Sequence, residues 1–202
     1  MKVLLGISGA SGATYGVRTL ALLLARGEDV HVLVTGTAWG ILAAEVWDGQ
    51  LPAGMDARRK GLGRLASSSR PFRLHAEDDF GIPFASGSNP PDAMIVAPCS
   101  MGTLGRIAHG VSSSVLTRCA DVALKERKPL VLVARETPLS VIHLENMLTL
   151  ARAGAHVLPA CPGFYHRPET VSGLVDFVVS RALSCIGVDA GLLPRWGEGK
   201  EE

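Results

Sequence analysis

The stretch Lys2–Gly16, KVLLGISGASGATYG, determines how the rest of the chain is interpreted. It begins with a short apolar run and changes abruptly to small residues over positions 8–12. A helical pattern of apolar residues follows at once, from Val17 to Leu24. The stretch therefore predicts a buried strand, a glycine-rich turn and a helix N-terminus. Such a turn presents backbone N–H groups to an anion, and we expect that anion to be a phosphate.

The bulk composition indicates one domain with an unusually apolar surface. The 202 residues suit a single hydrophobic core, and 47% of them are apolar but only 19% charged. The mean hydropathy of +0.26 is high for a soluble monomer. It predicts strands buried on both faces and some surface covered by further subunits. We expect one domain over residues 1–202, with a C-terminal tail at about 187–202.

Charge, apolar runs and cysteines exclude several classes of function. The net charge of +1 predicts no binding to nucleic acid or to an acidic membrane. No run approaches the roughly 20 apolar residues that span a bilayer, and Gly6 interrupts the start that resembles a signal peptide. The cysteines form no C-x-x-C pair, so we expect no disulfide or zinc site and a cytoplasmic location. They are Cys99, Cys119, Cys161 and Cys185.

Strand and helix patterns alternate along the chain, which predicts an α/β fold with a mostly parallel sheet and helices on both faces. Residues 48–71 show weak periodicity and are predicted to be irregular, and the long loop 76–92 is predicted to be functional. The predicted later strands are 29–35, 72–74, 93–97, 130–134 and 155–158. The predicted later helices begin near Gly36 and cover 112–125, 140–152 and 169–185.

In such sheets ligands bind beyond the carboxyl ends of the strands, and small or charged residues gather there. A dinucleotide site would need an acid after the second strand, where this chain has Thr35. No lysine closes the glycine turn as in a P-loop, and Gly9–Ala13 lacks the final glycine of a nucleophile elbow. A mononucleotide phosphate site of the flavodoxin-like FMN type fits the pattern. The alternative is that the glycines only allow tight strand–helix packing.

A second group of basic residues follows in the latter half of the chain. Arg118 and Lys125 are seven residues apart, so one helix would point both the same way. Arg135 and Glu136 come directly after a buried strand, which favours an active-site position over a solvated loop. The alternative for Lys125 is simple complementation of a helix C-terminus. The six histidines show no metal-ligand spacing, so we expect phosphate chemistry that relies on Arg and Lys.

Six stretches of the chain resemble the UbiX-type flavin prenyltransferases. This resemblance implies a flavodoxin-like Rossmann fold, a dodecamer with active sites between subunits, and alkyl transfer without a metal. The implied reaction joins the dimethylallyl group of dimethylallyl monophosphate to N5 of reduced FMN and then closes a ring at C6. The prenylated FMN would serve UbiD-type decarboxylases, including those of ubiquinone synthesis. The stretches are GISGASGATYGVR (6–18), FASGS (84–88), APCSMGTL (97–104), residues 120–148, LPACPGFYHRP (158–168) and LLPRW (192–196).

The resemblance also implies individual roles. Glu136 would be the acid–base residue and Ser11 would lie near the flavin N5, with Lys125 and Tyr165 as the other catalytic residues. Thr35 stands where relatives carry Ser, and Trp196 matches a tail residue of open role. The implied FMN contacts are Gly9, Ala10, Ser11, Thr35, Ser100, Met101, Gly102, Thr103 and Arg135. The implied contacts of the prenyl phosphate are Ser86, Gly87, Arg118, Lys125, Tyr165 and Arg181.

Two other functions remain open at this point. An FMN-dependent cysteine decarboxylase shares the general fold, but we expect an Asn-rich, Met-containing substrate motif in that class and find none. A non-catalytic FMN-binding protein would have no need for the basic residues or for Glu136.

Overall fold

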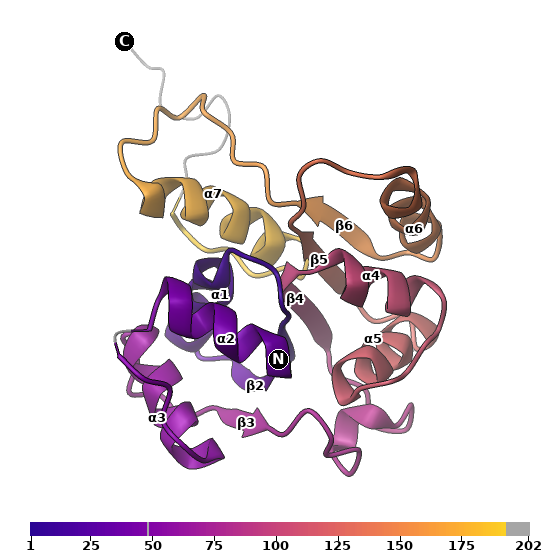
Figure 1. Cartoon of the computed structure of the whole chain (residues 1–202), viewed down its shortest axis with the longest axis horizontal. Coiled ribbons are helices and arrows are strands. Elements are labelled where there is room, and N and C mark those ends of the chain that lie inside the picture. Colours follow the sequence, from indigo (N-terminus) through magenta and orange to yellow (C-terminus); the bar gives the residue numbers. More distant parts are fainter. Residues whose placement is uncertain (48, 193–202) are drawn as a thin grey trace.

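The computed structural model describes residues 1–47 and 49–192. It is an α/β fold whose six strands form one parallel sheet in the order β3-β2-β1-β4-β5-β6. Figure 1 shows this sheet passing through the middle of the molecule. The strands are β1 (Lys2–Ile7), β2 (Asp29–Val34), β3 (Arg73–His75), β4 (Ala93–Cys99), β5 (Leu130–Ala134) and β6 (His156–Pro159).

Helices cover both faces of the sheet, as predicted (Figure 1). One face packs against α1 (Ala13–Ala25), α2 (Gly36–Glu45), α3 (Met55–Leu65) and α7 (Val171–Ser184). The other packs against α4 (Met101–Ala108), α5 (Val115–Lys125), α6 (Val141–Arg152) and the short 3₁₀ helix η1 (Pro83–Ala85).

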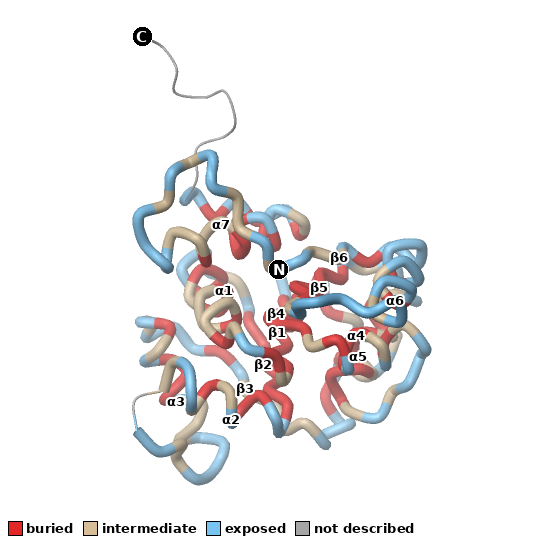
Figure 2. The backbone as a smooth tube through the Cα atoms, turned by 45° about the horizontal axis from the view of Figure 1, so that its top comes forward, coloured by how far each residue is buried: buried red, intermediate tan, exposed pale blue. Residues whose placement is uncertain are grey.

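The central strands are buried on both faces, which accounts for much of the apolar composition. All seven residues of β4 are buried, and so are all five of β5. Alternate residues of β1 belong to different cores, with Leu5 on the α1 side and Leu4 on the α5 side. Figure 2 shows the strands as the most buried part of the chain and α6 as largely exposed.

The strand order places a switch point between β1 and β4. The chain runs outward from β1 to β3 on one side, then crosses to β4 and runs outward again to β6. Without the three-residue edge strand β3, the order is that of a five-stranded flavodoxin-like sheet. Ligands of such sheets bind outside the carboxyl ends of the strands at the switch point, here after Ile7 and Cys99.

The prediction of irregular structure over residues 48–71 is wrong in its middle, where α3 forms. Gly61 and Gly63 weaken the helical signal because glycine lowers helix propensity. Gly61 is required by packing, since a Cβ there would overlap the Trp47 ring. Leu62 is fully buried in the core, so tertiary packing outweighs the low propensity.

The predicted helix 112–125 begins later than expected, at Val115. Ser114 is its N-cap, and its side-chain oxygen accepts a hydrogen bond from the Thr117 N–H at 3.3 Å. The Ser114 N–H in turn donates to the Thr117 hydroxyl oxygen at 3.1 Å, which completes a capping box. Ser112 therefore lies in the loop before the helix.

Two histidines on neighbouring strands form a stacked pair under η1. His31 of β2 and His75 of β3 have ring centroids 5.0 Å apart and nearly parallel planes, and His31 also meets the Phe84 ring edge-on. Their Nδ1 and Nε2 atoms are 2.7 Å apart. Burial first, and then His75, lower the pKa of His31 to about 4, against a smaller opposing effect of Asp29.

This pair predicts loss of stability in mild acid. In the unfolded chain His31 binds a proton near pH 6.5, whereas the folded chain resists protonation until about pH 4. Stability is therefore intact above pH 6.5 and should fall by about 2 kcal/mol between pH 7 and pH 4.5. Urea unfolding of wild type and His31→Leu across this range measures the effect. The unfolding free energy should depend less on pH in His31→Leu than in wild type, but equally in His156→Gln. An equal pH dependence in all three proteins would contradict the prediction.

Two further features concern membrane insertion and the cysteines. Among the helices of residues 1–47 and 49–192, none has the length and apolarity needed to cross a membrane. All four cysteines are free thiols, with Cys99 and Cys119 buried in the core.

Candidate functional site

The glycine turn after β1 is held close to β4. Gly12 is the N-cap of α1 and has a φ of 104°, a left-handed conformation that favours glycine. A Cβ on Gly16 would lie 2.5 Å from the Ala97 carbonyl oxygen, so only glycine lets α1 approach β4. The Ser8 hydroxyl donates to the Pro98 carbonyl oxygen at 3.0 Å and accepts from the Ser100 N–H at 2.8 Å. The turns after β1 and β4 are thereby joined.

The anion at the start of α1 is a side chain of the protein. Glu45, the last residue of α2, accepts hydrogen bonds from the Gly12 and Ala13 N–H groups, each at 2.8 Å. Burial raises the pKa of Glu45, but hydrogen bonds from Ser11, Ala13 and Gly12 outweigh it, so the pKa lies below its usual value. These two amides of the turn therefore bond the carboxylate of Glu45, and phosphate binding at the turn stays a prediction.

Sequence reasoning did not identify Glu45. It lies more than 30 positions from the turn, and nothing in the spacing of Gly9 or Gly12 points to it. The available signal is the length of α2, whose ten residues carry Glu45 from the end of β2 back to the neighbouring turn. A helix of that length spans about 15 Å, enough to reach the start of α1.

The end of β5 brings two of the predicted residues to the same turn. Arg135 follows β5 directly, and its Nε donates to the Ser11 carbonyl oxygen at 3.0 Å. Arg135 also contributes to lowering the pKa of Glu45. Glu136 is the next residue and is exposed, with its carboxylate accepting from the Thr137 N–H at 3.1 Å. Ser11, Arg135 and Glu45 therefore form one polar cluster, and Glu136 stands beside it.

Hydroxyl groups line the neighbouring strand ends. Thr35 is the N-cap of α2, where its side-chain oxygen accepts from the Ala38 N–H at 3.3 Å. Ser100 is the N-cap of α4 and accepts from the Thr103 N–H at 3.3 Å. The implied FMN contacts at 100–103 are thus the cap and first turn of α4. Together with the 9–11 turn, these strand ends surround the switch point between β1 and β4.

A second group of predicted residues lies along α5, which begins beside the carboxyl ends of β2 and β3 and ends at Lys125, before β5. The Arg118 Nε donates to the Ala85 carbonyl oxygen at 3.0 Å, and Lys125 pairs with Glu126. A Cβ on Gly87 would collide with the Lys125 Nζ, so the loop containing Ser86 rests on the end of α5. Arg118 and Lys125 thus share one side of α5, as their spacing predicts.

The length of β5 separates Lys125 from the polar cluster at the switch point. Lys125 ends the helix that leads into β5, whereas Arg135 follows the last residue of β5. The five residues of β5 rise by about 16 Å, so one chain does not bring Lys125 beside Arg135.

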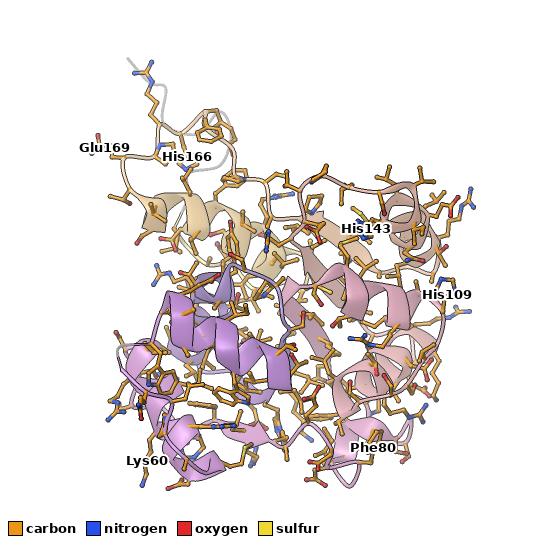
Figure 3. The ribbon with its side chains drawn as sticks, viewed as in Figure 1. Lys60, Phe80, His109, His143, His166 and Glu169 are labelled. Atoms are coloured by element: carbon orange, nitrogen blue, oxygen red, sulfur yellow. The ribbon has the colours of Figure 1, made fainter. Side chains whose placement is uncertain are left out.

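Tyr165 and Arg181 lie on either side of Phe177 of α7, near β6. Tyr165 lies in the loop before α7, half exposed, with its ring edge-on to Phe177 at 5.8 Å between centroids. The next residue, His166, stacks on Phe177, and Figure 3 shows it on this loop beside the start of α7. Arg181, one turn beyond Phe177, lines a cavity of about 460 Å³ between β6 and α7. Trp196 lies outside the described residues.

A metal-binding arrangement is not found in the part of the chain that the structure describes. Within residues 1–47 and 49–192, no three His, Cys, Asp or Glu side chains are grouped as ligands would be.

The switch point of the parallel sheet thus brings together hydroxyl groups, an arginine and a glycine turn. The Flavoprotein family model matches residues 1–183. Flavin prenyltransferase UbiX of Pseudomonas aeruginosa is 48% identical over 98% of this chain and 94% of the relative. The corresponding protein of Methanocaldococcus jannaschii is 42% identical over 98% and 99%. The chain belongs to the UbiX flavin prenyltransferase family.

Solved structures support the same assignment. AnUbiX, crystallised with FMN and dimethylallyl pyrophosphate, superposes with a TM-score of 0.85 at 37% identity and covers 97% of both chains. This likeness confirms the predicted flavodoxin-like α/β fold. A dodecameric FMN-dependent UbiX-like decarboxylase from Escherichia coli O157:H7 has a TM-score of 0.82 at 38% identity, over 94% of this chain and 96% of that one.

Proposed function

We propose that this protein transfers a dimethylallyl group from dimethylallyl monophosphate to reduced FMN, and that the prenylated FMN serves a UbiD-type decarboxylase. The observation that carries the proposal is the 48% identity with a flavin prenyltransferase over nearly the full length of both chains. The polar cluster at the switch point supports it, because it contains predicted flavin contacts and an adjacent carboxylate.

The residues at the switch point fit FMN. The 9–11 turn, Thr35 and the first turn of α4 offer backbone amides and hydroxyl groups, and Arg135 adds a positive charge. When bound, reduced FMN would supply the electron-rich N5 that accepts the prenyl group. In this proposal Ser11 lies beside the reacting edge of the flavin, and Arg135 orients the turn through the Ser11 carbonyl oxygen.

The role proposed for the basic residues is to bind the prenyl phosphate and stabilise its departing charge. Arginine, lysine and tyrosine donors form strong charge-assisted hydrogen bonds to phosphate oxygens. Lys125, Arg118 and the 86–87 loop would supply some of them, and Tyr165 and Arg181 the others. Glu136 would then move a proton within the same site.

Because these groups lie apart in one chain, the proposed site is assembled from neighbouring copies. Lys125 and the neighbouring 86–87 loop of one subunit would meet the switch point of another. The relative from E. coli is dodecameric, and we propose the same assembly here. The exposed apolar face of α6 supports an assembly of this kind, since patches of this type mark protein contacts. It contains Val141, Ile142, Leu144 and Leu148, and the exposed Leu139 lies just before the helix.

The competing functions have less support. A cysteine decarboxylase would not need the basic residues around Lys125, and a passive FMN carrier would not need an exposed carboxylate at the end of β5. The free cysteines agree with a reducing compartment, and we propose a cytoplasmic location.

The proposal predicts a specific product. Purified protein incubated anaerobically with FMN, dithionite and dimethylallyl monophosphate should yield a flavin heavier by one C5H8 unit. Mass spectrometry of the extracted flavin measures it, with dimethylallyl diphosphate as a parallel donor and heat-treated protein as control. Recovery of unmodified FMN alone from both donors would overturn prenyl transfer.

A further inference from the structure

An exposed arginine reaches the start of α4 although it belongs to the last turn of that helix. Arg106 donates from Nη2 to the Thr103 hydroxyl oxygen at 3.2 Å. Its Nη1 lies 3.8 Å from where a Cβ of Gly102 would be, so the guanidinium lies along the first turn. A cation is normally favoured at a helix C-terminus and disfavoured near the N-terminus. None of the ion pairs found in residues 1–47 and 49–192 includes Arg106.

The hydrogen bonds of Thr103 have a definite direction. Its hydroxyl oxygen accepts from the Arg106 guanidinium, which can only donate, and from the Ser100 hydroxyl at 3.0 Å. Two donors use both acceptor positions of a hydroxyl oxygen. The single proton of Thr103 is then left to donate. Thr103 is only 2% exposed, and a buried hydroxyl donor needs an acceptor.

We propose that Arg106 is a positioning residue which commits the buried Thr103 hydroxyl to donate to a phosphate oxygen. The inference rests on the proposed function, in which Thr103 contacts FMN, and it adds Arg106 and the chemistry of the acceptor. A dianionic phosphate suits this place because the α4 N-terminus and the guanidinium both favour negative charge. Gly102 leaves room there for the guanidinium. The phosphate belongs either to FMN or to the allylic donor.

Binding of FMN and of riboflavin, which lacks the phosphate, distinguishes these sources. In Arg106→Met the Kd for FMN should rise at least about tenfold, because the Thr103 hydroxyl is no longer committed to donate to the charged phosphate, and the Kd for riboflavin should be unchanged. Arg106→Lys should recover part of the loss because an ammonium group also donates. Arg152→Met, on the exposed last turn of α6, is the matched control. If only the KM for dimethylallyl monophosphate rises, the phosphate is that of the donor.

A double-mutant cycle tests the positioning role itself. Thr103→Val removes the hydroxyl, and in that background Arg106→Met should have little further effect, because both changes break the same chain of hydrogen bonds. Thr103→Ser, which keeps a hydroxyl, should bind FMN like wild type and shows that the fold tolerates change there. Independent, additive losses would overturn the positioning role. Equal loss for FMN and riboflavin, or no loss for any phosphate ligand in Arg106→Met, would overturn the phosphate assignment. Failure of wild type to bind FMN would instead refute the proposed function.

Discussion

Glu136→Gln should lower the turnover number by about 10²-fold or more and leave the affinity for FMN within about twofold of wild type. The carboxylate of Glu136 follows β5 directly, next to Arg135, and is exposed where a ligand at the switch point would lie. The glutamine amide keeps the shape of the carboxylate and most of its hydrogen bonds, but it can neither accept nor return a proton. A loss confined to turnover therefore separates proton transfer from binding.

Single-turnover kinetics with reduced FMN and dimethylallyl monophosphate measure this effect, and calorimetry measures the FMN affinity. Glu145→Gln is the matched control, since Glu145 is an exposed carboxylate on α6 away from the strand ends. Wild-type turnover in Glu136→Gln would remove this residue from the mechanism. A parallel loss of FMN affinity would make it a binding residue.

Mixing two inactive variants should restore activity if the site is shared between copies. Lys125→Ala removes a proposed phosphate contact and Glu136→Gln removes the acid–base group, so each alone should retain about 1% of activity or less. In a random mixed oligomer, about one quarter of the sites would combine an intact Lys125 from one copy with an intact Glu136 from another. Activity should therefore return to about one quarter of wild type.

Co-expression with two different affinity tags isolates the mixed oligomers for this measurement. The control pairs Lys125→Ala with the double variant Lys125→Ala/Glu136→Gln, which contains no intact Lys125 and should stay inactive. Mixed oligomers no more active than their parents would show that both residues serve the same copy. That result would contradict the proposal that β5 keeps the two groups apart within one chain and that neighbouring copies complete each site.

Local patterns predicted the switch-point half of the molecule well, because short-range signals determine it. The apolar run before Gly6 and the glycines after it determine a strand, a turn and a helix start within a few residues. Arg135 could be placed because it follows a buried strand, and parallel strands end at one edge. The Ser11 contact with Arg135 follows from that topology.

The parts that the sequence did not reveal depend on long-range packing. The helix α3 forms because Gly61 accommodates Trp47 and Leu62 reaches the core, and neither contact has a local signature. The bonds of Glu45 to the glycine turn join residues far apart in the chain. The separation of Lys125 from Arg135 required knowing that α5 runs back along the sheet. Residue types indicated the chemistry, but only the packing showed which groups meet.

The two ends of the sheet have a consequence for behaviour at high protein concentration. The edge strands β3 and β6 are its shortest, with three and four residues. Pro159 closes β6 without an N–H to offer, so each edge presents few unpaired backbone groups to another chain. Amyloid-like growth by strand addition therefore has little template here, and association is left to helix surfaces such as that of α6. We therefore expect the protein, despite its apolar composition, to resist fibril formation during prolonged storage.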